Sequence, residues 1–302
     1  MIIKSALLIL RLSLAALIGK CAFGQTPALP AELGPHTWTA SVKVIGEDGN
    51  PIVGANVAVS YTIVPLPTDP NQPQYGEVKG MTDTNGMFIA SHTDSSLGLA
   101  VVADESGYYA THIGHQFYYD EKNRHPNFTL QLKKIGKPIP MYAKSVKLGV
   151  PVFNRPVGYD LEAGDWVAPY GKGLNTDFIF TVTNSTIVVS FPNAGDGIQG
   201  LTRDWNLGVG GLLSSHEAPI DGYQPEYKQT QMQKLDKIYY FRVKTKIDDN
   251  GQIVSAYYGK IYGDFMQFRY YYNPTPNDRN VEFDPKQNLL QGMQSFENVK
   301  AP

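Results

Sequence analysis

Along most of the chain, apolar and polar residues alternate one by one in short runs, and turn-forming residues separate the runs. Between residues 39 and 44, for example, Ala40, Val42 and Val44 lie two apart with polar side chains between them. A period of two places successive side chains on opposite faces of a β-strand. The 302 residues include 29 Gly and 21 Pro and only 18% are charged, a composition that excludes a coiled coil or an acidic disordered chain. We therefore expect an all-β protein.

The first 24 residues are typical of a secretory signal peptide. Lys4 and Arg11 precede an apolar run at residues 12–19, and Ala22 and Gly24 are the small residues that a signal peptidase requires before its cleavage site. The run is shorter than the roughly 20 residues that span a bilayer. We expect cleavage after Gly24 and export by a bacterium to the periplasm, the cell surface or the medium, with no transmembrane segment left.

Cleavage there would remove the single cysteine, Cys21, so the mature protein would contain no disulfide. It would also remove three of the 26 basic residues, and the remaining 23 against 28 acidic residues give a net charge of −5. No binding to nucleic acid is therefore expected. Two alternatives stay open: an uncleaved N-terminal anchor, and a lipoprotein in which Cys21 carries the lipid.

Proline-punctuated stretches mark the boundaries between segments of the chain, because proline cannot donate a hydrogen bond to a β-ladder. These boundaries predict two β domains. The expected order is a signal peptide at 1–24, a linker at 25–38, a first β domain at 39–133, a linker at 134–141, a second β domain at 142–273 and a C-terminal tail at 274–302 that runs over the surface.

Three motifs in the first domain follow one another in a characteristic order. Gly49–Val57 reads GNPIVGANV, Thr82–Phe88 reads TDTNGMF, and Gly107–Tyr109 reads GYY. Residues 39–133, which contain these motifs, resemble the carboxypeptidase regulatory-like (transthyretin-like) domain. The resemblance implies a seven- or eight-stranded β-sandwich that acts as an accessory or binding unit, and it brings no catalytic residues. The four prolines of residues 64–75 depart from the family pattern and leave the strand order there open.

The second domain shows the same alternation, and residues 141–302 resemble no family whose function we can name. Its pattern favours a second antiparallel β-sandwich-like domain. Residues 226–237 have the only pattern that a helix could use, and it is a weak one. Strands are expected at residues 178–183, 186–191, 239–247 and 266–272.

A group of carboxylates beside Trp166 is the strongest candidate for catalysis, and it consists of Asp160, Glu162 and Asp165. Two carboxylates that flank a glycosidic bond hydrolyse it, and alternation would place Asp160 and Glu162 on one face of a strand. The alternative is a solvated loop anchored by Trp166. We favour the loop because the spacing places no second carboxylate across a cleft, and we expect no catalytic residues.

The pair His112 and His115 could suggest a metal site. Their odd spacing would place the two rings on opposite faces of a strand, and no glutamate completes a zinc-protease motif. We therefore interpret the pair as part of a surface loop, and we expect neither a metal nor another cofactor.

Tyrosine is unusually abundant, with 19 copies, several of them adjacent in expected strands. Of two adjacent tyrosines in a strand, one faces inward and the other outward, and we expect Tyr240, Tyr257 and Tyr271 to face outward. Exposed rings stack on sugars or anchor protein interfaces, so these three residues and Trp166 are the candidate ligand-binding residues. Packing between neighbouring strands is the competing interpretation.

Together these features predict a secreted, non-enzymatic β-sandwich protein that acts in binding or in assembly of the cell envelope or surface. The alternative is a carbohydrate-binding or carbohydrate-active protein that uses the outward tyrosines and the carboxylates Asp160, Glu162 and Asp165. The expected partners are accordingly polysaccharides or envelope proteins. The sequence leaves the ligand and the oligomeric state open.

Overall fold

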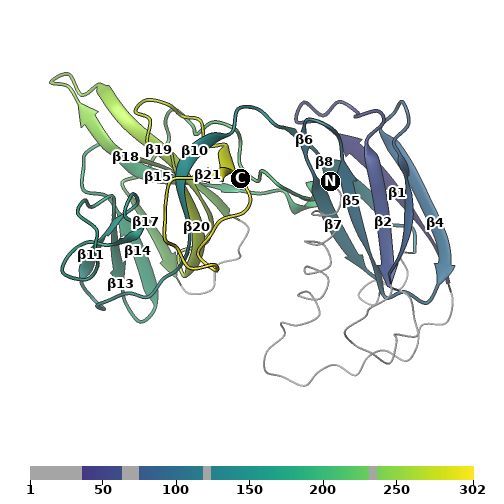
Figure 1. The fold of residues 1–302 in the computed structure, drawn as a ribbon, viewed down its shortest axis with the longest axis horizontal. Coiled ribbons are helices and arrows are strands. Elements are labelled where there is room, and N and C mark those ends of the chain that lie inside the picture. Colours follow the sequence, from purple (N-terminus) through teal and green to yellow (C-terminus); the bar gives the residue numbers. More distant parts are fainter. Residues whose placement is uncertain (1–35, 63–74, 118–123, 231–236) are drawn as a thin grey trace. The chain divides into compact units, whose positions relative to one another are not determined.

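The protein consists of two β-rich units, and a computed structural model describes residues 36–62, 75–117, 124–230 and 237–302 (Figure 1). Within these ranges the chain is almost entirely β-structure, which confirms the predicted all-β fold class. The expected signal peptide at residues 1–24 lies outside the described residues. Unit 1 contains Met1–Ile135 and Asp204–Gly211, and unit 2 contains Gly136–Arg203 and Leu212–Pro302.

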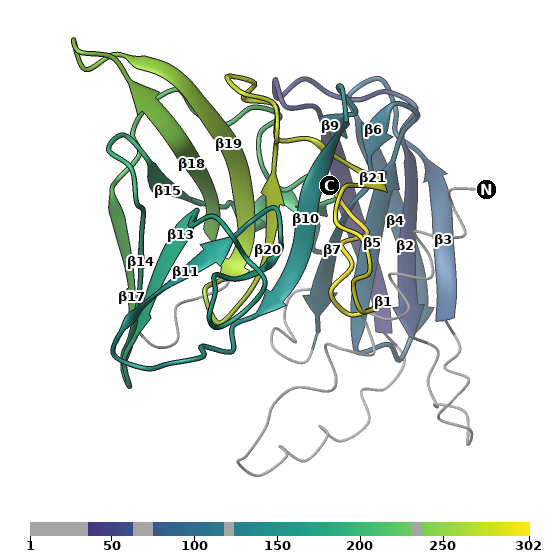
Figure 2. The ribbon, with the colours of Figure 1, turned by 60° about the vertical axis from the view of Figure 1, so that its left-hand side comes forward.

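Unit 1 is a sandwich of two sheets (Figure 2). In the smaller sheet, β1 (His36–Ile45) pairs antiparallel with β4 (Met87–Asp94) and parallel with β8 (Asn127–Gln131). The larger sheet has the order β16-β7-β5-β2-β3, with bounds Val209–Gly210, Thr111–Gln116, Gly98–Asp104, Asn56–Thr62 and Tyr75–Met81. A short ribbon pairs β6 (Tyr108–Tyr109) with β9 (Lys133–Lys134). Every second residue of β1 from Trp38 to Val44 is fully buried in the core of unit 1, as the alternation predicts.

The motif residues of unit 1 shape its turns. Thr82 Oγ1 accepts a hydrogen bond from Ala55 N at 2.9 Å and donates one to Ile52 O at 2.6 Å, so it joins the end of β3 to the start of β2. Gly86 has a φ of 71°, and a Cβ there would lie 2.6 Å from Val44 O, so the turn requires glycine. These contacts explain why the motifs contain Thr82 and Gly86. The assignment to the carboxypeptidase regulatory-like family stays a prediction.

A short segment from much later in the chain completes unit 1. Asp204–Gly211 contains a 3₁₀ turn, η1 (Trp205–Leu207), followed by β16, whose Val209 lies opposite His112 of β7. The predicted boundaries assign these residues to the second domain, because a strand of two residues carries no periodicity that would show its partner. Among the described residues η1 is the only helix, and none of them forms a helix long and apolar enough to cross a membrane.

Unit 2 pairs a six-stranded sheet with a five-stranded sheet (Figure 1). The larger has the order β15-β18-β19-β20-β10-β21, with bounds Gly197–Thr202, Lys237–Ile247, Ile253–Asp264, Gln267–Tyr272, Ile139–Lys147 and Phe283–Asn288. The smaller has the order β12-β11-β13-β14-β17, with bounds Asp165–Trp166, Pro156–Asp160, Phe178–Val182, Thr186–Ser190 and Glu226–Thr230. Their facing sides share a core of aromatic residues that includes Phe178, Phe180, Phe241, Tyr270 and Tyr272.

The six-stranded sheet has a second core on its other face. Tyr240, Tyr258, Tyr262 and Tyr271 from β18, β19 and β20 are buried there, together with the apolar side chains of Val281, Phe283 and Val299. The Tyr271 ring meets the Phe283 ring edge-on, with the ring centroids 5.5 Å apart. Its hydroxyl donates to Ala301 O at 3.1 Å. The C-terminal residues therefore bury a face that antiparallel sheets often leave to solvent.

The structure changes three of the sequence-based expectations. The helix considered for residues 226–237 is wrong where the structure describes it, because Glu226–Thr230 is the edge strand β17 paired with β14. The expected surface tail, residues 274–302, contributes β21 to the large sheet and supplies buried side chains to its second core. Residues 36–38 of the expected first linker belong to β1.

We predict that Phe283→Ala destabilises unit 2 by about 3–5 kcal/mol, because it removes a fully buried ring and leaves a cavity beside Tyr271. Urea unfolding, followed by hydrogen exchange of peptides from unit 2, measures the loss. The matched control is Phe296→Ala, which removes a ring of the same tail that is 76% exposed and so costs little. Equal effects of the two substitutions would show that the tail does not form a core.

Candidate functional site

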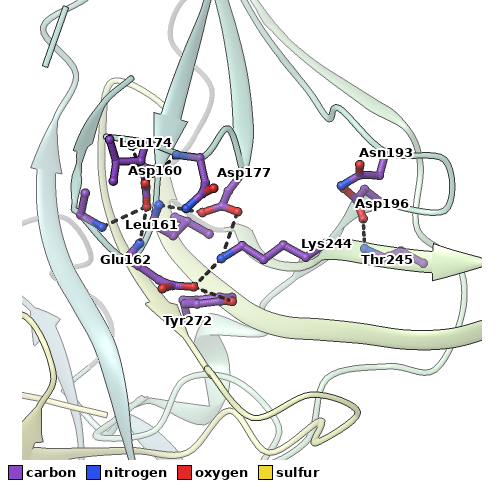
Figure 3. Close-up of polar contacts among 12 residues, drawn as sticks. Asp160, Leu161, Glu162, Leu174, Asp177, Asn193, Asp196, Lys244, Thr245 and Tyr272 are labelled. Carbon is purple, nitrogen blue, oxygen red and sulfur yellow. Dashed lines mark hydrogen bonds and ion pairs between the residues drawn. The ribbon is translucent and has the colours of Figure 1, made fainter. Parts of the chain in front are cut away.

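Asp160, the first of the candidate carboxylates, is a hydrogen-bond acceptor for the backbone. Its Oδ1 accepts from Glu162 N at 2.9 Å and from Ala163 N at 3.0 Å. Its Oδ2 accepts from Leu174 N and Asn175 N, both at 2.9 Å. Burial raises the pKa of this carboxyl, but the four N–H donors outweigh that effect and bring the pKa below its ordinary value. Asp160 is thus ionised, and its hydrogen bonds hold the backbone of residues 162–163 and of residues 174–175 next to each other (Figure 3).

Asp165 and Trp166 are also parts of the local structure. Asp165 Oδ1 accepts from Trp166 N at 2.8 Å and its Oδ2 from Lys172 N at 2.9 Å, so the carboxylate holds the loop that follows β12. The half-buried Trp166 ring packs edge-on against Tyr159 and Phe180, with centroid distances of 5.3 and 5.7 Å. The expected solvated loop is wrong for these residues, because Asp165 and Trp166 form β12 and Asp160 is buried, although Trp166 does anchor the segment.

Glu162 lies in a different polar cluster, which the sequence did not predict as a unit. The ammonium of Lys244 forms an ion pair with Glu162 Oε1, and Tyr272 OH donates to the same oxygen at 3.3 Å. Lys244 Nζ is also 3.6 Å from Asp177 Oδ1. Figure 3 shows the two carboxylates on either side of the lysine. We call Lys244, Glu162, Asp177 and Tyr272 the lysine cluster.

A β-bulge brings Lys244 into this cluster. The pairing of β18 with β19 shifts register between Val243 and Lys246, and Lys244 has a φ of 53°. Asp196 Oδ1 holds the bulge by accepting from Thr245 N at 2.8 Å. In a regular strand the side chains of Lys244 and Val243 would point to opposite faces of the sheet. Because of the bulge, both side chains point to the face that carries the aromatic core. Its Nζ lies 5.1 Å from the centroid of the Tyr272 ring.

Asp177 is the most unusual carboxylate of the cluster because its side chain is fully buried. Its Oδ2 accepts from Leu161 N at 2.9 Å, and its Oδ1 has no hydrogen-bond partner. Burial raises the pKa of Asp177 to about 6, and the Leu161 N–H and the charge of Lys244 offset only part of that effect. For Lys244, burial favours the neutral amine, but the hydrogen bond to Glu162 outweighs it and raises the pKa.

The four candidate ligand-binding residues do not come together. The expectation that Tyr240 and Tyr271 are exposed is wrong: their exposed fractions are 1% and 0%, because the second core of unit 2 covers the outward face of the sheet. Tyr257 faces the first core instead, where it is half-buried and lies near Tyr272 and Lys244. Alternation placed Tyr240 and Tyr271 on one face of the sheet correctly and gave no information on what covers that face.

A second buried polar group lies in the core beneath the C-terminal segment. Ser214 Oγ accepts from Lys260 Nζ at 3.1 Å and from Tyr262 OH at 2.9 Å. A serine beside a lysine is one arrangement that activates a hydroxyl for nucleophilic attack. All three residues are at least 96% buried, so no substrate reaches the hydroxyl and the group serves to satisfy buried polar atoms.

The histidine pair is placed in a strand rather than in the surface loop that we expected, because both residues belong to β7. The His115 ring packs edge-on against Phe117 at 5.2 Å and Phe128 at 6.2 Å. Among the described residues, no three His, Cys, Asp or Glu side chains are grouped so that they could hold a metal ion.

Comparisons with known proteins give only weak structural similarities. No known family and no curated protein matches the sequence. A 3-chlorocatechol 1,2-dioxygenase from Rhodococcus opacus 1CP is 13% identical over 36% of this chain, with a TM-score of 0.25. The chain spans 64% of the dioxygenase, which is less than two thirds of its length.

Two other structures are similar over more of the chain. A variant of the shaft pilin SpaA from Lactobacillus rhamnosus GG is 11% identical, covers 76% of this chain and 94% of the pilin, and has a TM-score of 0.23. The Bacillus anthracis TIE protein is 8% identical and covers 82% of this chain and 49% of its own, with a TM-score of 0.20. At such identities and TM-scores, neither a fold assignment nor a residue role follows from these similarities.

We predict that Asp160→Asn destabilises unit 2 by about 2–4 kcal/mol at pH 7, because the new amide group faces two N–H donors that lose their acceptor. Because folding lowers the pKa of Asp160, its contribution is present above the ordinary value of 3.8 and is lost as the pH falls through the folded value. The difference between wild type and variant should therefore shrink below pH 4.

Urea unfolding between pH 3 and 7, followed by hydrogen exchange of peptides from unit 2, measures this difference. Asp249→Asn makes the same substitution in an exposed turn of unit 2 and should leave the free energy of unfolding almost unchanged. A pH-independent difference for Asp160→Asn would contradict the role of the charged carboxylate.

Proposed function

We propose that this is an exported, non-enzymatic protein that acts in assembly at the cell envelope or surface, with unit 1 as a carboxypeptidase regulatory-like module. The observation that carries the proposal is the use of Asp160: both carboxylate oxygens are occupied by four backbone N–H groups. A carboxylate with every oxygen held by the backbone is a structural acceptor and not a general acid or base. This favours a scaffold over a glycosidase.

The burial of the candidate aromatic rings favours protein partners over sugars. Stacking on a sugar requires exposed ring faces, and two of the four candidate rings lie in a core. The other two, Trp166 and Tyr257, are half-buried and engaged by neighbouring aromatic rings. We therefore propose envelope proteins as the partners of this chain, and polysaccharide binding becomes an outcome that the experiment below can report.

Export is tested with the full chain, carrying its own leader and a C-terminal tag, expressed in a Gram-negative bacterium. We expect the tagged protein in the periplasm, on the surface or in the medium, with Gln25 as its first residue. A chain that keeps residues 1–24 and stays in the cytoplasm would contradict the proposal. Replacing Leu14 by Arg in the apolar run should block export and serves as the control.

The nature of the partner is tested by co-sedimentation of the exported protein with isolated envelopes. We expect binding that is lost when the envelopes are first treated with protease and that persists in the presence of soluble polysaccharides. Binding that survives protease and is displaced by one polysaccharide would favour the carbohydrate alternative and overturn the proposal of protein partners.

A further inference from the structure

The lysine cluster joins an amine, a buried carboxyl and a second carboxylate, which are the groups that amide formation needs. Asp177 immediately precedes β13 of the five-stranded sheet, and Lys244 belongs to β18 of the six-stranded sheet. Lys244 Nζ is 3.6 Å from Asp177 Oδ1, and Glu162 contacts the same ammonium. We propose that Lys244 and Asp177 form an intramolecular amide cross-link between the two sheets of unit 2, with Glu162 as the proton relay.

Asp177 is suited to be the electrophile. Its side chain has no exposed surface, and its Oδ1 has no hydrogen-bond partner, so this oxygen is not held by the fold as those of Asp160 are. The Leu161 N–H donates to the other oxygen at 2.9 Å and would stabilise negative charge that develops there during attack on Cγ. The raised pKa of about 6 increases the share of the neutral acid, which is the reactive form.

Lys244 is suited to be the nucleophile because the fold forces it into place. Its left-handed φ of 53° is costly for a side chain with a Cβ, and such strain persists only where the surroundings impose it. The Asp196–Thr245 hydrogen bond fixes the bulge from one side, and the rings of Tyr257 and Tyr272 flank the ammonium at 5.8 and 5.1 Å. The amine is thus held beside Asp177 among aromatic side chains.

The step needs no oxidant, reductant or further reactant. Glu162 accepts a proton from the Lys244 ammonium, and the free amine attacks Cγ of Asp177 to form the C–N bond. Glu162 passes that proton to the departing hydroxyl of the neutral Asp177 acid as the C–O bond breaks and one water leaves. It then accepts the second proton of the nitrogen, so that a neutral amide and a protonated Glu162 remain. Holding the two groups in contact supplies an effective concentration on the order of 10⁵ M or more, which can reverse the preference for hydrolysis in water.

Another lysine–carboxylate pair of unit 2 lacks these features and provides the control. Lys144 Nζ lies 2.9 Å from Glu297 Oε1, and both side chains are partly exposed. Glu297 also accepts a hydrogen bond from Gln294 N, and Lys144 donates to Gly164 O. This pair is solvated and fully hydrogen-bonded, so we expect it to stay an ion pair.

Mass spectrometry of the purified exported chain tests the cross-link. We expect an intact mass 18 Da below that calculated from the sequence and the determined N-terminus. Trypsin should be unable to cleave after Lys244, and the digest should contain a branched peptide that joins residues 173–203 to residues 243–246. An intact mass equal to the calculated one, or an 18 Da loss confined to a linear peptide, would overturn the proposal.

Variants assign the roles of the three residues, with circular dichroism to confirm folding. Lys244→Arg and Glu162→Gln should have their full calculated masses, and Asp177→Asn should lose 17 Da, because ammonia then leaves in place of water. Lys144→Arg should keep the 18 Da loss. A folded Glu162→Gln chain that still loses 18 Da would overturn the role of Glu162, and a Lys144→Arg chain at full mass would overturn the assignment to Lys244.

Discussion

Burial of the six-stranded sheet on both faces is the constraint on which the rest of unit 2 depends. Both faces of β18, β19 and β20 carry large aromatic rings, and each face requires a separate cover. The five-stranded sheet covers one face, and the C-terminal residues around Phe283 cover the other. Because both sides are dry, each tyrosine hydroxyl needs a partner inside the protein.

These hydroxyl partners explain why the sheet contains tyrosine where phenylalanine would fill the space equally well. Tyr270 OH donates to Leu161 O at 2.8 Å and so attaches the loop after β11 to the sheet. Tyr271 OH bonds to Ala301 O near the end of the chain, and Tyr239 OH to Tyr227 OH on β17. The tyrosine excess that suggested an exposed binding surface therefore serves to fasten loops, the tail and an edge strand to a buried sheet.

The sequence predicted the strands well and predicted their surroundings poorly, for one physical reason. Alternation is a local property, and it placed the expected strands at residues 178–183 and 239–247 close to β13 and β18. Whether a face is covered depends on residues far along the chain, such as Phe283 and Val299, which stand outside any periodic run. Lys244 departs from the alternation for a related reason, since one extra residue in a bulge reverses the side of the sheet to which its side chain points.

Asp160 and Asp177 show how the surroundings give two similar carboxylates different roles. They lie at opposite ends of the loop between β11 and β13, and both accept backbone hydrogen bonds. Asp160 receives four N–H groups and is stabilised as an anion, whereas Asp177 receives one and is buried without further donors, so its pKa moves in the other direction. The buried carboxyl of Asp177 beside the constrained Lys244 is where the proposed covalent link would join the two sheets. An amide would remove the burial penalty of both charges at once, which an ion pair in the same position cannot do.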